Sequence, residues 1–94
     1  METTTLSPRF DLGQILVASQ AEQRLESAEV RAALHRHARG DWGEVTPQQV
    51  TENERGLRDG GSVLSVFRDG WQRRFCVLTN RHRSATLVVN WADD

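Results

Sequence analysis

The strongest constraint on the fold is a succession of three strand-like runs in the last third of the chain. Residues 62–68, 71–79 and 84–91 are rich in β-branched and aromatic side chains, with short polar segments between them. Asp69-Gly70 favours a two-residue hairpin turn, because type I′ turns need positive φ at both central positions. Residues 80–83 supply a second loop of ordinary length. The pattern predicts a three-stranded antiparallel meander.

Helix signals precede the meander. Five residues at helical spacing predict an amphipathic helix: Val30, Ala33, Leu34, His37 and Ala38. We expect Ser27 to cap this helix and Gly40 to end it in the left-handed conformation.

A second helix is expected from residue 46 to about residue 57, because Thr46 and Gln49 form a capping-box pattern around Pro47. Residues 15–17 suit a short extra strand, and residues 19–25 suit a polar helix. The fold class expected is α+β: two to three short helices packed on a three-stranded, or with residues 15–17 four-stranded, antiparallel meander.

Composition limits the class of protein. The 94 residues are 37% hydrophobic and 27% charged, which fits one globular domain whose residues 1–8 are flexible. No apolar run reaches the roughly 18 residues that cross a bilayer, and residues 1–10 do not resemble a signal peptide. Cys76 is the single cysteine, so no internal disulfide forms. We expect a cytoplasmic protein without membrane contact.

The two turns fix which strand residues share a face. One predicted face contains Val63, Phe67, Cys76, Leu78, Ala85, Leu87 and Val89. The other contains Leu64, Val66, Phe75, Val77, Thr86 and Val88. Both are apolar, whereas a meander with helices on one side normally has a polar back. Either the N-terminal segment covers the second face, or that face meets another molecule, such as a second copy of the chain.

Basic residues concentrate in the meander. All twelve Lys-plus-Arg residues are arginines, and residues 66–91 contain five of them with one acid. The predicted contact surface is a basic hairpin with a tryptophan at its margin: Arg73, Arg74, Arg81, His82, Arg83 and Trp71. It suits an acidic protein patch or nucleic-acid phosphates. The alternative is that these charges only keep the hairpin solvated and discourage edge pairing.

Residues with reactive side chains give weaker patterns. His82 between two arginines suits a metal-free, toxin-like ribonuclease, in which the arginines hold the scissile phosphate. His35 and His37 lie about 200° apart around a helix, so they cannot chelate one metal. Cys76 is expected to be a buried, unreactive thiol. We therefore expect no catalytic residue, no metal and no cofactor.

Several short matches together resemble a group of uncharacterised short proteins of plasmids and phages. The matching residues are His37, Gly40-Asp41-Trp42-Gly43, Asn53-Glu54, Leu57, Leu64-Ser65, Thr79 and Arg83-Ser84-Ala85-Thr86. The pattern of that group is H-x-x-G-D-W-G, N-E-x-x-L, L-x-S and T-x-x-x-R-S-x-T, and the resemblance spans residues 34–89. Where the group has Glu-Ala-Asp at the hairpin tip, this chain has Asn80-Arg81-His82, so the tip is basic instead of acidic.

The resemblance implies a mobile-element origin and no particular activity. Together with the basic hairpin it favours a non-enzymatic binding protein that occludes a host protein or nucleoprotein, for example as an inhibitor of CRISPR or restriction defence. The alternatives are the ribonuclease and a nucleic-acid-binding regulator.

Overall fold

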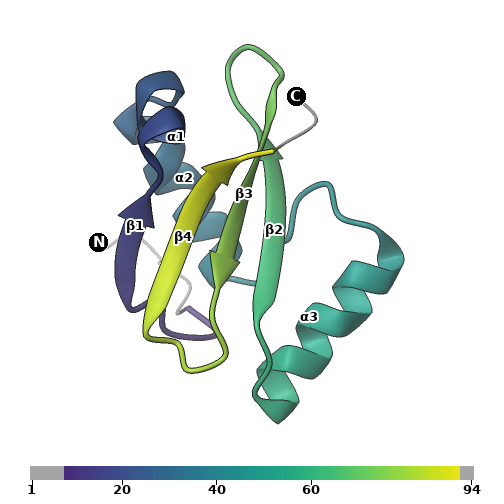
Figure 1. Cartoon of the computed structure of the whole chain (residues 1–94). Helices are drawn as coiled ribbons and strands as arrows, with labels where there is room; N and C mark the ends of the chain where they lie inside the picture. The colour runs from purple at the N-terminus through teal and green to yellow at the C-terminus, as the bar shows by residue number, and fades with distance from the viewer. Residues whose placement is uncertain (1–7, 92–94) are drawn as a thin grey trace, which may run out of the picture.

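The computed structural model describes residues 8–91, and these form three helices and one four-stranded sheet (Figure 1). The helices are α1 (Ser19–Arg24), α2 (Ser27–Ala38) and α3 (Pro47–Asp59). The strands are β1 (Gln14–Val17), β2 (Val63–Arg68), β3 (Arg74–Thr79) and β4 (Ala85–Asn90). The predicted α+β class is confirmed. Residues 1–8 were predicted to be flexible. Of these residues, only Pro8 lies in the described part of the chain.

The strand order in the sheet is β1-β4-β3-β2. β2, β3 and β4 form the predicted antiparallel meander, and β1 is the additional strand. β1 pairs with β4 in parallel, not antiparallel, orientation. A parallel neighbour needs a long crossover, and three helices and two strands separate β1 from β4 along the chain.

Local capping explains where the two longer helices begin. Thr46 accepts a hydrogen bond from the backbone N–H of Gln49, and Pro47 occupies the first turn of α3, as predicted. The predicted cap of α2 was wrong by one residue. Glu26 and Glu29 form a reciprocal capping box there, so the cap is a carboxylate in place of the Ser27 hydroxyl.

The loop between β2 and β3 corrects the predicted register. Arg68 pairs with Arg74, so five residues form the loop and not Asp69-Gly70 alone. The buried Asp69 carboxylate organises this loop by accepting hydrogen bonds from the N–H groups of Trp71 and Arg73 at 2.8 and 2.9 Å. A shift of an odd number of residues turns β2 over relative to β3 and β4. Val63 and Phe67 therefore share a face with Phe75 and Val77.

The inner face of the sheet packs against α1 and α2. A core cluster joins the two helices to β2, β3 and β4; it contains Ala21, Leu25, Ala33, Phe67, Phe75, Val77 and Val88. α3 does not cover either face but lies beside the β2 edge (Figure 1). The opposite side of the sheet, called the outer face below, is therefore free of helix cover within residues 8–91.

Candidate functional site

The predicted basic hairpin is not one cluster. Trp71, Arg73 and Arg74 lie in or next to the β2–β3 loop, whereas Arg81, His82 and Arg83 lie in the β3–β4 loop. These loops are at opposite ends of β3, as Figure 1 shows. The six-residue strand separates them by roughly 17 Å at 3.3 Å per residue. The prediction that these four arginines and His82 gather at one rim was wrong.

The arginines near the β2–β3 loop have partners within the protein. The Arg73 Nε lies 3.2 Å from the Asp69 carboxylate, and the Arg74 guanidinium lies 5.2 Å from the centre of the Trp91 ring. Burial alone would raise the pKa of Asp69, but the hydrogen bonds from Arg73 and Trp71 and the Arg73 charge hold that pKa below its ordinary value. Trp71 is 78% exposed. This end of the sheet thus carries one Arg–Asp ion pair, one arginine stacked on a tryptophan ring and one exposed aromatic ring.

Arg83 is a structural residue of the other loop. Its guanidinium donates to the carbonyl oxygens of Gly61 and Asn80 at 2.8 Å each and of Gly56 at 3.1 Å. It also lies 5.5 Å from the centre of the Phe10 ring. Arg83 thereby joins the β3–β4 loop to the end of α3 and to the N-terminal segment.

The Arg83 contacts also explain a hairpin tip without glycine. Arg83 has φ 58°, the left-handed conformation that glycine usually supplies. The Asn80 carboxamide closes the loop, accepting from the Ser84 N–H at 2.9 Å and donating to the Ser84 hydroxyl at 2.8 Å. The three guanidinium hydrogen bonds offset the conformational strain at Arg83. Only Arg81 and His82 of the predicted tip residues are exposed.

A buried chain of hydrogen bonds runs through the inner face. His37 contacts Ser65 through Nδ1 at 2.5 Å and Thr79 through Nε2 at 2.8 Å. The Thr79 hydroxyl lies 2.7 Å from the Thr86 hydroxyl, which donates to the Leu12 carbonyl at 2.7 Å. The four residues linked in this way are each 0% exposed: His37, Ser65, Thr79 and Thr86. We call this set the polar chain.

The end of the polar chain fixes the direction of every hydrogen bond in it. A carbonyl can only accept, so the Thr86 proton points to Leu12 and Thr79 must donate to Thr86. Thr79 then accepts from His37, which places the imidazole proton on Nε2. Nδ1 is left as the acceptor for the Ser65 hydroxyl. A neutral His37 is therefore the Nε2–H tautomer.

The surroundings of His37 keep it neutral. Burial lowers the pKa of His37 to about 4, with a smaller contribution from the positive charge of Arg83. The rings of Phe10 and Trp42 pack against the imidazole, with centroids 5.2 and 5.7 Å away. A serine hydroxyl donating to an imidazole resembles a nucleophile and its base. Here both are fully buried, so this pair is not accessible to a substrate in the described conformation.

A second polar framework fixes α3. The Asn53 carboxamide, also 0% exposed, accepts from the Leu64 N–H at 3.0 Å and donates to the Leu64 carbonyl at 2.8 Å. Glu54 accepts from Arg9 at 2.7 and 3.0 Å and from the Trp42 indole at 3.2 Å. Many residues on which the resemblance rests belong to these two frameworks. In this chain they hold α2, α3 and the N-terminal segment to the sheet.

The outer face differs from both faces predicted from the sequence, because the predicted register placed the β2 residues on the wrong side of the sheet. The register places four leucines in one row across all four strands, in the order Leu16, Leu87, Leu78 and Leu64. Leu16 is 44% and Leu78 38% exposed. The next row contains Val89, Cys76 and Val66. We call the four residues of the first row the leucine row.

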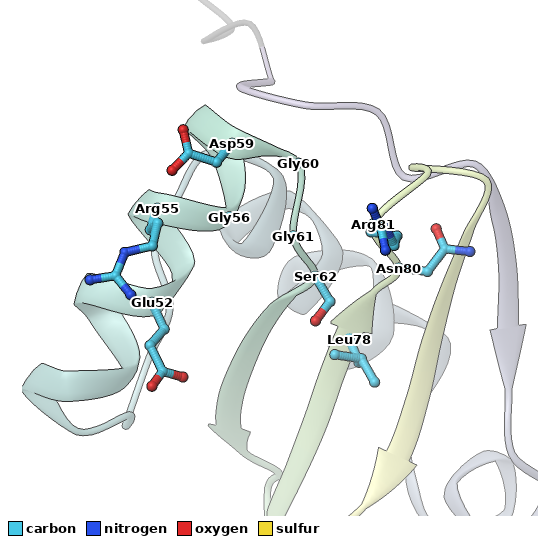
Figure 2. A pocket seen from close by; sticks show the side chains of 10 residues that line it. All are labelled: Glu52, Arg55, Gly56, Asp59, Gly60, Gly61, Ser62, Leu78, Asn80 and Arg81. Atoms are coloured by element: carbon cyan, nitrogen blue, oxygen red, sulfur yellow. The ribbon is translucent and has the colours of Figure 1, made fainter.

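A pocket of about 610 Å³ adjoins the leucine row. Figure 2 shows α3 on one side and Leu78 and Asn80 on the other, with residues 60–62 crossing between them. Glu52 and Arg55 belong to the α3 wall, and Arg81 belongs to the sheet wall. The leucine row and this pocket together are called the outer-face site. The sequence signal for the leucine row was that alternate residues of each strand face the same side of the sheet. The wrong length predicted for the β2–β3 loop assigned the β2 residues to the wrong face and so hid this row.

No family model, curated protein or solved structure matches the chain. Within residues 8–91, no helix has the length and apolar character needed to cross a membrane.

Proposed function

We propose that the chain is a non-enzymatic binding protein that occludes a protein partner with its outer-face site. The observation that supports this is the leucine row, which spans every strand on the face that no helix of the described chain covers. An antiparallel sheet packed on one side normally has a polar outer face. An apolar patch on such a face is characteristic of an interaction surface.

The charges around the outer-face site indicate the chemistry of the partner. The centre of the site is apolar, while Arg81 and the charged side chains of α3 stand at its margin. Interfaces commonly have this arrangement of a hydrophobic centre and a polar rim. The partner we propose has an apolar patch with an acidic group facing Arg81. In the mobile-element setting that the resemblance implies, a host defence protein or nucleoprotein is the most concrete candidate.

Capture experiments with matched variants test the proposal. Leu78→Glu places a charge in the centre of the leucine row. Gln23→Glu adds the same charge at an exposed position of α1, on the other side of the sheet. The wild type and Gln23→Glu should capture the same partner from host lysate, and the purified partner should bind both with equal affinity. Leu78→Glu should lose at least tenfold in affinity, because it buries an unpaired charge in the interface.

Two outcomes would favour the other functions. Cleavage of RNA by the purified chain, abolished by His82→Ala, would identify the ribonuclease. Binding to DNA or RNA that weakens steeply with salt and with Arg81→Glu would identify the nucleic-acid-binding regulator. Equal partner affinity of Leu78→Glu and wild type would refute the outer-face site.

A further inference from the structure

β1 is an edge strand of the sheet. Among the strands that residues 8–91 form, β1 ends the strand order, and its only neighbour is β4. The Gln14 N–H bonds to the Ser84 carbonyl and the Ala18 N–H to the Val88 carbonyl, so alternate residues of β1 face β4. The N–H and C=O groups of Ile15 and Val17 therefore point away from the sheet, and no partner for them occurs within residues 8–91.

Within residues 8–91, this edge lacks the features that usually prevent pairing. The four residues Gln-Ile-Leu-Val include no charge and no proline. Ile15 and Leu16 are 38% and 44% exposed. Proteins normally protect a free edge with charged side chains, proline, a bulge or a covering segment. An uncharged and exposed edge is a template for another strand.

We infer that β1 pairs with β1 of a second copy in antiparallel orientation about a two-fold axis through Leu16. In this register Ile15 lies opposite Val17 of the second copy, and Val17 opposite its Ile15. Every outward N–H then meets a carbonyl, which gives four hydrogen bonds between the chains. The paired segment is limited to β1 because Gly13 has φ 66° on one side and α1 begins at Ser19 on the other.

The charges and the outer face favour a second copy over a foreign peptide. Self-pairing brings no like charges into opposition, since β1 has none. Leu16 would lie beside Leu16 of the second copy on the outer face, which makes the two leucine rows continuous. A stable interface needs about 800 Å² from each partner, and a four-residue edge supplies less. The dimer is therefore reversible and depends on concentration.

Disulfide trapping tests the register in a Cys76→Ser background. Two residues opposite each other at a non-hydrogen-bonded position have Cα atoms about 4.5 Å apart, which a disulfide can span. Leu16→Cys should therefore give a covalent dimer under mild oxidation. Gln14→Cys is exposed on the same face, but the register holds its two copies roughly 13 Å apart, too far for a disulfide. It should remain monomeric.

Sedimentation provides an independent readout. The apparent mass of the wild type should rise from 10.7 kDa toward twice that value as concentration increases. Ile15→Pro removes an outward N–H and no bond to β4, and Leu16→Lys opposes two charges at the axis. Both variants should stay monomeric, while Ile15→Val should behave as wild type. Circular dichroism checks that the variants fold. If Ile15→Pro does not fold, Leu16→Lys alone tests the dimer.

Three results would overturn the inference. The first is a wild type that remains monomeric at every concentration. The second is a dimer that Leu16→Lys leaves intact. The third is equal disulfide formation by Leu16→Cys and Gln14→Cys. None of them bears on the partner affinity of Leu78→Glu, so the dimer and the proposed function can fail separately.

Discussion

His37 shows how a residue with reactive chemistry serves the fold at this position. Its ring is 0% exposed and both nitrogens are used within the polar chain. A protonated imidazole would donate from Nδ1 toward Ser65, whose own proton already points there. The pKa of about 4 reflects this burial and the nearby Arg83 charge.

Stability should therefore fall in mild acid. In the unfolded chain His37 has its ordinary pKa of 6.5, so the unfolded state binds a proton first as the pH falls. The free energy of unfolding should drop by about 2 kcal/mol between pH 7.5 and pH 5, and by about 3 kcal/mol at pH 4. Urea unfolding monitored by tryptophan fluorescence measures this. A flat profile above pH 5, or imidazole NMR signals showing His37 charged at pH 5, would contradict the assignment.

Arg83 and Arg81 provide a matched pair in one loop. Arg83→Ala removes three hydrogen bonds to carbonyl oxygens and should lower the free energy of unfolding by about 2 kcal/mol. Arg81→Ala should change it by less than about 0.5 kcal/mol, because Arg81 is exposed. Urea unfolding of both variants makes the comparison. Equal losses would mean that the Arg83 contacts do not stabilise the loop.

At the scale of elements, the Asn53 side chain attaches α3 to the edge of β2. Asn53 bonds both backbone groups of Leu64, as a neighbouring strand would. Asn53→Asp keeps the shape but replaces the donor with a second acceptor and buries a charge. It should destabilise the protein by about 3 kcal/mol. Gln48→Glu, the corresponding change at an exposed position of α3, should be nearly neutral. Thermal unfolding that ranks the two variants equally would refute the role of Asn53.

The elements themselves were largely predictable, and the pairing of β2 was not. The apolar spacing, the Thr46 cap and the strand-like runs placed the helices and strands, since these signals are local. The β2–β3 loop depended on a buried carboxylate, Asp69, which accepts from residues two and four positions ahead. The interpretation of Asp69-Gly70 as a two-residue turn did not allow for these hydrogen bonds. One loop-length error then exchanged the faces of β2.

At the scale of the molecule, the predicted contact surface failed for a topological reason. Successive turns of a meander lie at opposite ends of the sheet, so Arg73 and Arg81 were bound to be far apart. The strand order alone implies this separation. The face on which the helices pack does not follow from the sequence, because both sheet faces are apolar. Only the three-dimensional arrangement shows that Leu78 and its row are on the face that no helix of residues 8–91 covers.

The most direct test of the outer-face site is methyl NMR of the chain titrated with the partner that the capture experiment identifies. If the outer-face site binds the partner, the methyl signals of Leu16, Leu64, Leu78 and Leu87 should shift or broaden. The signals of Val63 and Val77, which lie on the inner face, should stay in place. Shifts confined to the surroundings of Trp71 or His82, with the leucine methyls unchanged, would show that the partner does not bind the outer-face site.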